Sequence, residues 1–378
     1  MTHIEIIGGG PAGLYFALLM KRRTGGGLRV RVSEQNPRDA TFGFGVVFSD
    51  RALEFLRDGD EETYTLLHRN MQTWDDLGIA HRGETVAIDG NGFSAIGRLE
   101  LLELMYRECE AAGVELDFET RVEDLDARAR ADLLVGADGV NSSVRAHWAK
   151  AFGPNLSYLS NKFVWYGTTQ PFERLTLTFK QNEDGAFVAH HYRYRPDMST
   201  FIVECDAETW GQADFETLND AESRAYCEQV FAEELGGHPL ISNKSIWRNF
   251  PVLEVRNWYH GNAVLLGDAL RTVHFSIGSG TRLAMEDALA LANAFAAEDM
   301  NVARALDRFL AERRPVVDKI LSGALASARW YERFAERMNL SPTAFAYDYM
   351  TRSGRMDDRR LREVAPRFYR RWQAEAGA

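Results

Sequence analysis

The segment Ile4-Glu5-Ile6-Ile7-Gly8-Gly9-Gly10-Pro11-Ala12-Gly13-Leu14 decides the fold of this chain. A short apolar run breaks into Gly-x-Gly-x-x-Gly and is followed by apolar residues at helical spacing, which predicts a strand, a tight turn and a helix. In such a turn Gly8 permits the bend, Gly10 lets the backbone approach a pyrophosphate, and Gly13 lets helix and strand pack closely. The segment therefore predicts a dinucleotide phosphate bound at the helix N-terminus.

A carboxylate follows at the spacing that a dinucleotide fingerprint requires. Glu34 comes just after a second apolar strand, predicted over residues 28–32, about 20 residues beyond the last glycine of the turn. A carboxylate at this position accepts hydrogen bonds from ribose hydroxyls. The pair of features predicts a Rossmann-like α/β domain rather than a chance glycine-rich turn.

Two later segments repeat the pattern of an apolar strand that ends in a glycine and a carboxylate. Residues 133–145 read as a strand ending in Asp138-Gly139, with Ser and Arg at the start of a helix. Residues 263–269 read as a strand ending in Gly267-Asp268, followed by Gly278-Ser279-Gly280 and a predicted helix over 283–297. Three glycine and carboxylate motifs thus follow one another, each at the end of a predicted strand.

This order of motifs resembles the class A flavoprotein aromatic hydroxylases over nearly the whole chain. The resemblance implies that the first motif holds the ADP half of FAD and that Asp268 meets the ribityl chain or the pyrophosphate. It also implies that Asp138 serves both FAD and the nicotinamide cofactor, and that the turn at residues 278–280 presents amides to the flavin ring. The cofactor-contacting residues that it implies are Gly8, Gly10, Pro11, Ala12, Gly13, Glu34, Gly45, Arg98, Asp138, Gly267, Asp268, Gly278 and Gly280.

Three stretches narrow the resemblance to one subgroup: residues 161–168, 198–204 and 267–278. In the last stretch Leu270-Arg271 replace the family's Ala-His, and Phe275 stands where the family has Pro. The subgroup contains salicylyl-CoA 5-hydroxylase, the monooxygenase half of 2-aminobenzoyl-CoA monooxygenase/reductase and the flavin hydroxylase of violacein biosynthesis. The resemblance implies an enzyme that uses FAD, NADH or NADPH, and O2 to insert one oxygen atom into an aryl-CoA thioester. Salicylyl-CoA, hydroxylated at C5 to gentisyl-CoA, is the favoured substrate.

Other functions stay open at this point. A 2-aminobenzoyl-CoA or indole-type substrate is the alternative within the subgroup. A flavin reductase or dehydrogenase that adds no oxygen atom shares the fold, and so does a non-catalytic FAD-binding protein. The sequence does not separate NADH from NADPH, because the resemblance implies no second nucleotide fingerprint.

We expect an FAD-binding domain interleaved with an antiparallel-sheet substrate domain, and a helical C-terminus. The chain has 378 residues, of which 45% are apolar, which is longer than one typical domain of about 100 to 200 residues. The expected division is 1–75, 96–153 and 255–325 for the FAD-binding domain, 76–95 and 154–254 for the substrate domain, and 326–378 for the helical segment.

The sequence between the second and third motifs predicts the sheet of the substrate domain. Apolar and aromatic residues alternate at period two, the pattern of strands, and a helical pattern follows them. The predicted strands are 163–169, 175–179, 186–194 and 200–205, and the predicted amphipathic helix is 221–235. These patterns favour an antiparallel sheet backed by a helix.

Histidines are the candidates for the acid–base step, because a phenol or aniline ring is activated by a base that titrates near neutral pH. His190, on the predicted strand 186–194, is the first candidate, and His274, in the turn expected beside the flavin, is the second. His191 must point to the opposite face of the strand from His190, and the sequence does not decide which of the two faces inward. The residues predicted to line the substrate pocket are Trp165, Tyr166, His191 and Phe275.

Composition excludes several other classes of function. A net charge of -11 argues against a nucleic-acid surface, which needs clustered cations. Cys109, Cys205 and Cys227 share no close spacing, so neither a disulfide framework nor a metal site is expected. The chain shows no secretory signal and no apolar run of about 18 residues that would cross a membrane. We therefore expect a cytoplasmic protein with a small-molecule aromatic substrate; a homodimer is compatible with the sequence, which does not fix the oligomeric state.

Overall fold

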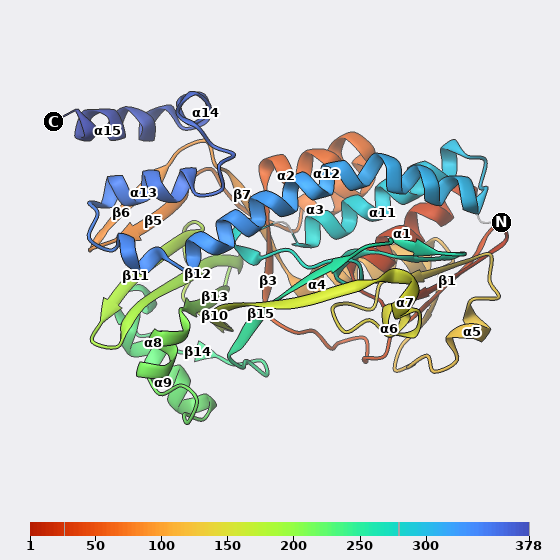
Figure 1. Cartoon of the computed structure of the whole chain (residues 1–378), viewed down its shortest axis with the longest axis horizontal. Helices are drawn as coiled ribbons and strands as arrows, with labels where there is room; N and C mark the ends of the chain where they lie inside the picture. The colour runs from red at the N-terminus through yellow and green to blue at the C-terminus, as the bar shows by residue number, and fades with distance from the viewer. Residues whose placement is uncertain (26, 279, 378) are drawn as a thin grey trace.

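The computed structural model describes residues 1–25, 27–278 and 280–377. Figure 1 shows an elongated molecule with a sheet near the N-terminus at one end and a second sheet, covered by the C-terminal helices, at the other. The long helix α12 (Val302–Tyr331) extends from the first sheet to the second. Ser279, which lies in the third glycine motif, is outside the described residues.

The first sheet has six strands in the order β16-β17-β9-β1-β2-β8. Their bounds are β16 (Tyr259–His260), β17 (Ala263–Leu265), β9 (Leu133–Gly136), β1 (His3–Ile7), β2 (Arg29–Ser33) and β8 (Glu115–Asp117). All neighbours pair in parallel except β16, which runs antiparallel to β17. The three glycine motifs follow the carboxyl ends of β1, β9 and β17, so the parallel pairing brings them to one edge of the sheet.

Helix α1 (Pro11–Thr24) forms because Pro11 occupies its first turn and Gly25 ends it in the left-handed conformation. Its residues 12–21 are all buried, because β1, α4 (Arg98–Ala111) and α11 (Gly280–Ala297) surround it. The other helices of this half are α2 (Asp50–Gly59), α3 (Glu61–His68), α5 (Leu125–Arg128), α6 (Ser143–His147) and α7 (Ala149–Phe152). The helix that carries the first motif is thus fixed within the largest apolar core.

The second sheet has eight strands. Seven follow the order β14-β10-β13-β12-β11-β5-β6, and β15 pairs with β10 beside them. Their bounds are β14 (Leu240–Ile241), β10 (Pro154–Thr168), β13 (Met198–Cys205), β12 (Gly185–Arg195), β11 (Thr176–Asn182), β5 (Leu77–His81), β6 (Glu84–Ile88) and β15 (Arg248–Val255). The four expected strands correspond to β10–β13, and their mutual pairing is antiparallel as predicted. Strand β5 joins β11 in parallel, which the sequence did not indicate.

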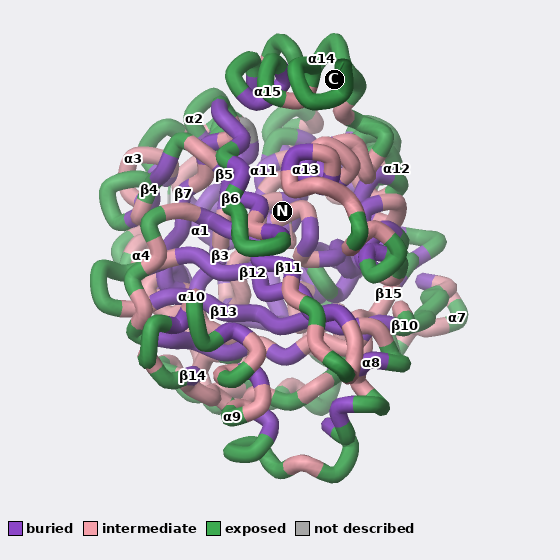
Figure 2. Tube along the Cα trace, turned by 90° about the vertical axis from the view of Figure 1, so that its left-hand side faces the viewer, coloured by how far each residue is buried: buried purple, intermediate pink, exposed green. Residues whose placement is uncertain are grey.

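Both faces of this sheet are covered, so β12 and β13 cross the molecule as buried tubes (Figure 2). One face packs against α8 (Ala207–Gln212), α9 (Asp220–Val230) and α10 (Ala232–Leu235). The single helix expected over 221–235 was wrong: the helix breaks at Phe231, whose buried ring lies 5.4 Å from that of Phe201. Packing of this ring onto the sheet accompanies a break that helical spacing alone does not reveal.

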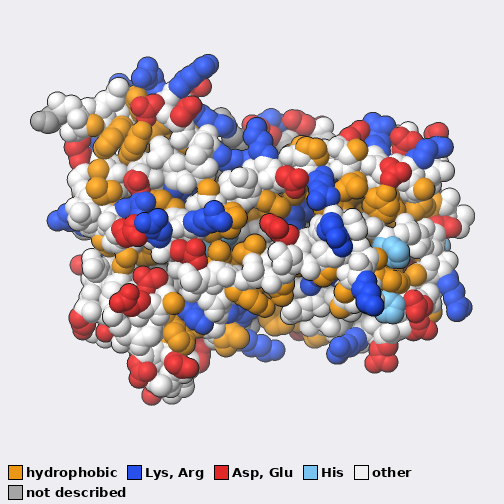
Figure 3. All heavy atoms as spheres, viewed as in Figure 1, with side chains coloured by type: hydrophobic (Ala, Val, Ile, Leu, Met, Phe, Trp, Pro, Cys, Tyr) orange, Lys and Arg blue, Asp and Glu red, His pale blue; other side chains and the backbone are white. Residues whose placement is uncertain are grey.

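The other face of the second sheet packs against α12 and the C-terminal helices. These are α13 (Pro342–Thr351), α14 (Asp358–Val364) and α15 (Pro366–Ala376), with a short 3-10 turn, η3 (Phe334–Arg337), before them. A small third sheet of β3 (Gly45–Ser49), β7 (Phe93–Gly97) and β4 (Gln72–Trp74) lies between the two larger ones. On the face shown in Figure 3, acidic and basic side chains are interspersed.

Strands β10 and β15 form a ribbon that extends from the second sheet toward the first. The ladder is interrupted between the pairs Tyr158–Pro251 and Lys162–Asn249, where three residues of β10 oppose only Phe250 of β15. The side-chain amide of Asn249 donates to the carbonyls of all three, Leu159, Ser160 and Asn161, at 2.9, 3.0 and 3.2 Å. This β-bulge re-aims the side chains around it.

Candidate active site

The first glycine turn has the geometry of a phosphate cradle. A Cβ atom on Gly8 would lie 2.3 Å from the carbonyl oxygen of Ala137, and one on Gly13 would lie 2.3 Å from that of Gly8. These two glycines are therefore required by the packing of the protein itself. A Cβ on Gly10 would meet nothing within 4 Å, so the N-terminus of α1 faces open space beside Gly10, as phosphate binding requires.

Glu34 lies at the end of β2, beside this turn. Its carboxylate accepts hydrogen bonds from the backbone N–H of Gly9 at 2.8 Å and from the backbone N–H of Asn36 at 2.8 Å. The structure thus brings the carboxylate and the glycine turn together, as the fingerprint predicts.

The second motif packs directly on the first. The carbonyl of Ala137 faces Gly8, and the next residue, Asp138, accepts hydrogen bonds from the N–H and hydroxyl of Ser143 at 2.7 and 2.8 Å. Its other carboxylate oxygen, Oδ1, is buried and has no partner among the described residues. Such an atom is costly to leave without a hydrogen bond, so Asp138 has capacity for a further donor.

The third motif reaches the same place from the other side. Gly267 has a φ of +57°, and a Cβ on it would lie 3.1 Å from that of Ala12 in the first turn of α1. Asp268 follows in a 3-10 turn, η1 (Gly267–Ala269). The Asp268 side chain is exposed. The surrounding protein nevertheless desolvates its carboxyl and raises the pKa, while the charges of Arg98 and Arg271 act to lower that pKa.

Arg98 faces Asp268 across this region from the first turn of α4. Burial lowers the pKa of its guanidinium, and the charge of Asp268 opposes that shift. The backbone N–H of Arg98 donates to Phe44 at 2.7 Å, which fixes the start of the helix beside the loop 41–44. A cation from helix α4 and a carboxylate from the 3-10 turn η1 therefore flank the space next to the glycine turn.

The remaining predicted glycines have different surroundings. A Cβ on Gly45 would lie 2.6 Å from the ring of Tyr194, and the Gly45 carbonyl accepts a hydrogen bond from the Tyr192 hydroxyl at 2.8 Å. The packing of β3 on β12 thus accounts for a glycine at this position. Gly278 has a φ of +58° after the 3-10 turn η2 (Phe275–Ile277), and Gly280 begins α11; a Cβ on either would meet no atom closer than 3.5 Å.

His190 lies on the face of the second sheet that is turned toward Phe275. Its ring lies 5.2 Å from the ring of Phe275 and stacks at 5.2 Å on Tyr331 of α12. Its Nε2 atom lies 3.3 Å from Oε2 of Glu204, a carboxylate on β13 that is only 1% exposed. Burial alone would raise the pKa of Glu204. The hydrogen bond from His190 and the electrostatic effect of the nearby His274 are together larger than this effect of burial, so the pKa is lowered.

His274 stands beside this group. Its ring lies 4.3 Å from Phe275 and 4.8 Å from Phe250, and its Nδ1 accepts a hydrogen bond from the N–H of Ser276 at 3.3 Å. Burial lowers the pKa of His274 to about 4, although the charge of Glu204 opposes the shift. His274 is therefore neutral at physiological pH.

The predicted pocket residues are divided between the two faces of the sheet. Trp165 pairs with Ile202 and lies on the His190 face, against the loop at Gly43. His191 and Tyr166 lie on the opposite face, where His191 shares a hydrogen bond with Thr178 at 2.9 Å and Tyr166 with Ser223 at 3.2 Å. The sheet separates these two residues from Phe275.

A comparison with protein families shows which family carries the three motifs. A family model described as "FAD binding domain" matches residues 1–324. The chain belongs to this FAD-binding family. It is an FAD-dependent aromatic monooxygenase with the class A flavoprotein hydroxylase fold, as the order of the motifs predicts.

Curated relatives of this FAD-dependent monooxygenase include three of high similarity. Salicyloyl-CoA 5-hydroxylase of Streptomyces sp is 40% identical over 93% of this chain and 69% of its own. A 3-hydroxy-4-methyl-anthranilyl-[aryl-carrier protein] 5-monooxygenase of Streptosporangium sibiricum is 37% identical over 88% and 90%. Protodeoxyviolaceinate monooxygenase of Chromobacterium violaceum is 35% identical over 92% and 94%. These names match the subgroup that the sequence predicts.

Solved structures share the fold. PqsL of P. aeruginosa, in complex with 2-aminobenzoylacetate, superposes with a TM-score of 0.70 at 23% identity and covers 89% of this chain and 98% of its own. A variant of 2-methyl-3-hydroxypyridine-5-carboxylic acid oxygenase gives a TM-score of 0.72 at 17% identity, over 97% of this chain and 96% of its own.

The residues present fit FAD. Open space beside Gly10 at the start of a buried helix suits a pyrophosphate. Oδ1 of Asp138, which has no partner among the described residues, and the exposed Asp268 offer acceptors for hydroxyl groups, and Arg98 offers a cation. Among the described residues, no cluster of three or more metal-ligating side chains occurs, and no described helix is long and apolar enough to cross a membrane.

Sequence reasoning gave no role to three residues beside His190: Glu204, Asn161 and Tyr331. The signal for Glu204 was a single carboxylate at the end of the otherwise apolar run Phe201-Ile202-Val203. Glu204 is two residues after Ile202, so both side chains lie on the same face of the strand. Ile202 pairs with His190, which places Glu204 on the His190 face. Tyr331 comes from the distant helix α12, so no local pattern indicates it.

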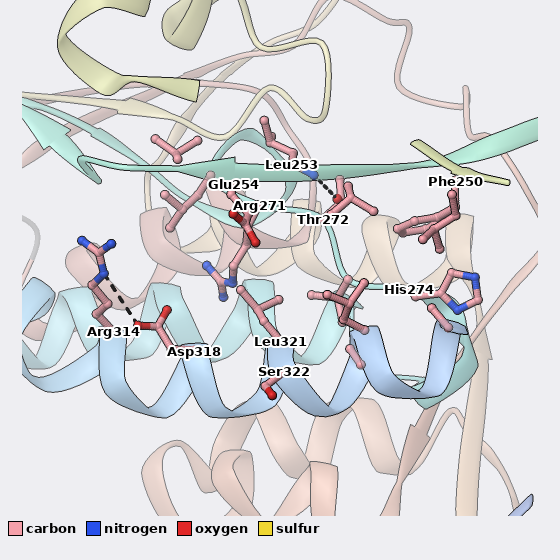
Figure 4. Close-up of a pocket in the computed structure, with 18 of the residues that line it drawn as sticks. Phe250, Leu253, Glu254, Arg271, Thr272, His274, Arg314, Asp318, Leu321 and Ser322 are labelled. Carbon is pink, nitrogen blue, oxygen red and sulfur yellow. Dashed lines mark hydrogen bonds and ion pairs between the residues drawn. The ribbon is translucent and has the colours of Figure 1, made fainter. Parts of the chain in front are cut away.

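A groove of about 410 Å³ lies between β15, the segment 270–274 and α12 (Figure 4). His274 and Phe250 lie at one end of it, and Arg314 and Asp318 at the other. Among the described residues neither Gly10 nor Arg98 lines the groove, which adjoins the site through His274 and Phe250 and, beside Asp268, through Arg271.

Proposed function

We propose that this monooxygenase hydroxylates an aryl-CoA thioester, namely salicylyl-CoA at C5 to give gentisyl-CoA. The observation that carries the proposal is the 40% identity, over 93% of the chain, to a protein named salicyloyl-CoA 5-hydroxylase. A second relative is named for an anthranilyl group on an aryl-carrier protein, which is also an aromatic acid held as a thioester. Both relatives thus favour a carrier-bound aromatic acid over a free one.

The cofactor assignment that we propose follows the motifs. Gly8 to Gly13 and Glu34 hold the ADP half of FAD, Arg98, Asp138 and Asp268 hold the central part, and Gly278 and Gly280 border the ring. FAD, reduced by NADH or NADPH, supplies the oxygen-transfer chemistry. The remaining tasks of the chain are to exclude water, orient the substrate ring and hold its hydroxyl.

We propose the division of the chain accordingly. Residues 1–75, 96–153 and 255–325 bind FAD, residues 76–95 and 154–254 cover the substrate, and 326–378 close the far side. The support is that all three cofactor motifs lie in the first set, while His190 and Trp165 lie in the second.

His190 is the base in this proposal, because it is the histidine of β12 that faces Phe275 and Trp165. Among the described residues no hydrogen bond engages Nδ1 of His190, whereas Nε2 lies 3.3 Å from Oε2 of Glu204, so we assign the substrate hydroxyl to Nδ1. A proton acceptor at a phenol raises the electron density of the ring at the para carbon. Phe275, Phe163 and Trp165 would exclude water around the ring.

The test is a screen of purified enzyme with FAD, NADH or NADPH, and ¹⁸O2. Salicylyl-CoA, 2-aminobenzoyl-CoA, an indole and free salicylate are compared, and products are read by mass spectrometry. We expect one ¹⁸O atom in gentisyl-CoA and little turnover of free salicylate. Labelled product from the indole or from 2-aminobenzoyl-CoA alone would replace the substrate assignment, and cofactor oxidation without any labelled product would refute it.

The alternative within the subgroup has its own support. The relative from Chromobacterium violaceum is named for protodeoxyviolaceinate, which is not an acyl carrier thioester. The indole arm of the screen addresses that alternative directly.

A further inference from the structure

Glu204 is a buried carboxylate in an apolar setting. Its cross-strand neighbours are Phe163 on β10 and Val188 on β12, and the glutamate is 1% exposed. Removing a carboxylate from water costs several kcal/mol unless its oxygens are hydrogen-bonded. The hydrogen-bond partners of Glu204 therefore decide whether its buried carboxylate is stable in the fold.

The β-bulge of β10 positions one hydrogen-bond partner of Glu204. Asn161 belongs to the three bulged residues, and its side-chain amide donates to Oε1 of Glu204 at 2.8 Å and to the Tyr331 carbonyl at 3.0 Å. Its own oxygen, Oδ1, has no partner among the described residues. Turning the amide over would place that oxygen against two acceptors, so the donors of Asn161 must face Glu204 and Tyr331.

With Oε1 engaged by Asn161, the other oxygen of Glu204 faces His190. A carboxylate only accepts hydrogen bonds, so Nε2 of His190, 3.3 Å from Oε2, must donate. We infer that Glu204, oriented by Asn161, is a positioning residue that keeps a proton of His190 on Nε2 and leaves Nδ1 to take the substrate's hydroxyl proton. The inference rests on the proposed function, in which His190 is the base.

The proton transfer is balanced within this group. The O–H bond of the substrate breaks, the N–H bond at Nδ1 of His190 forms, and the electron pair stays on the substrate oxygen. The Glu204 carboxylate offsets the charge of the resulting imidazolium, and the proton returns to the product oxygen. The other titratable groups packed nearby are His274 and Tyr331, with Glu332 and Arg352 acting on His274.

The orientation of Asn161 makes Glu204→Gln a decisive substitution. The glutamine oxygen must face the Asn161 donors, so its NH2 group must face Nε2 of His190. Nε2 then accepts, and the proton of His190 moves to Nδ1, where it blocks the base.

The double variant Glu204→Gln/Asn161→Asp is designed to restore the original tautomer. A protonated carboxyl group at position 161 donates to the Tyr331 carbonyl and accepts from the NH2 group of the new amide at position 204. That amide must then turn its oxygen toward Nε2 of His190, which donates again.

The control is Asp89→Asn. Asp89 is also a buried carboxylate, but it accepts from the N–H groups of Arg367 and Phe368 at 3.0 and 2.8 Å. Among the described residues, no hydrogen bond or ion pair joins Asp89 to His190 or to a cofactor motif. It therefore reports the loss of a buried carboxylate as such.

The first measurement is ¹⁵N NMR of histidine-labelled, FAD-loaded protein without substrate, with His190 assigned from the His190→Ala spectrum. We expect a protonated Nε2 in wild type and Asp89→Asn, a protonated Nδ1 in Glu204→Gln, and recovery in the double variant. A wild-type proton on Nδ1 overturns the inference without any variant, and an unchanged tautomer in Glu204→Gln also overturns it.

The second measurement is the hydroxylation rate at saturating substrate. We expect Glu204→Gln to lower kcat by about 10² to 10⁴, the range for a lost proton acceptor, with FAD content unchanged and partial rescue in the double variant. A reversed tautomer with an unchanged kcat overturns the positioning role. If wild-type enzyme hydroxylates no aryl substrate, the proposed function fails, and the NMR spectra alone decide whether Glu204 sets the tautomer.

Discussion

His190 and His191 are neighbours in β12, and the pleat of the strand gives them opposite surroundings. His190 faces Glu204, Phe275 and Tyr331, whereas His191 stacks on Phe201 at 5.5 Å in the core beneath the sheet. A substitution at one of them therefore reports on chemistry and a substitution at the other on packing. The two make a matched pair for experiments.

His190→Ala should lower the rate of hydroxylation by about 10² to 10⁴ while FAD binding stays nearly unchanged, because a positioned proton acceptor is lost. Rates measured in parallel on His191→Ala and His274→Ala provide the comparison. Near-wild-type rates in all three variants would exclude a histidine base.

His191→Gln should reduce the acid sensitivity of the fold. Burial lowers the pKa of His191 to about 3, with the charge of His190 acting in the same direction, whereas an unfolded histidine titrates near 6.5. The unfolded state thus binds more protons as pH falls below about 6.5, so stability is lost toward acid. Between pH 7 and pH 5 this one group should cost about 2 kcal/mol.

Denaturant unfolding of wild type and His191→Gln at pH 7 and pH 5 checks this. The difference between the two pH values should be smaller in the variant. An equal loss in both proteins would show that His191 is protonated in the fold.

Gly10→Val should abolish most FAD binding and leave the apoprotein folded. Gly10 has φ -81° and ψ 176°, which valine adopts, and a Cβ there meets nothing within 4 Å. We therefore expect the new side chain to collide with a bound pyrophosphate and not with the backbone of the apoprotein. Gly13→Val is the contrast, because its Cβ would lie 2.3 Å from a carbonyl oxygen. Flavin absorbance and thermal unfolding of the apoproteins separate the two, and full flavin retention by Gly10→Val would contradict the placement.

The residues around the glycine turn could be predicted because their roles depend on local backbone geometry. Gly8, Gly13 and Glu34 lie where their spacing indicates. Glu204 and Asn161 could not be assigned, since their contact depends on a bulge whose two strands are far apart in the chain. Gly45 lies against Tyr194, a packing partner that no motif encodes.

Among the elements, α15 depends on a cap from outside its own segment. The residue before it, Ala365, offers no side-chain cap, and Asp89, just after β6, accepts the N–H groups of Arg367 and Phe368 instead. This contact fastens the last helix to the edge of the second sheet.

Asp89→Ala should loosen α15 by about 0.5 to 2 kcal/mol, the range for a lost N-terminal cap. Limited proteolysis should then cut near residues 352–366 sooner than in wild type, with FAD content unchanged. Unaltered cleavage and unfolding would mean that the apolar contacts of Phe368 and Tyr369 hold the helix alone.

Periodicity identified the four central strands and α11 because each is buried on a regular pattern. It missed the break at Phe231 and the parallel addition of β5, because both depend on contacts across the sheet. It also gave no indication of the groove between β15 and α12, whose walls come from distant segments.

For the molecule as a whole, three motifs about 130 residues apart converge at one edge of the first sheet. A ligand that contacts all three stabilises only the folded chain. FAD at 100 times its dissociation constant should therefore raise the free energy of unfolding by about 2.7 kcal/mol. Denaturant titrations of apoprotein with increasing FAD check this, and a midpoint independent of FAD concentration would contradict a site built from all three.

The ribbon of β10 and β15 has a mechanical consequence. It joins the sheet that carries His190 to the half that carries the glycine turn, so any rotation of one against the other must bend the ribbon. A pair of strands bends most easily where the hydrogen bonds between the strands are missing, which here is at residues 159–161. There the side-chain amide of Asn249 donates to three backbone carbonyls of β10, and the Glu332 carboxylate accepts from the backbone N–H of Ser160 at 2.7 Å. Both side chains therefore restrain the interrupted segment. We expect these contacts to resist such bending, together with helix α12, which also extends between the two halves.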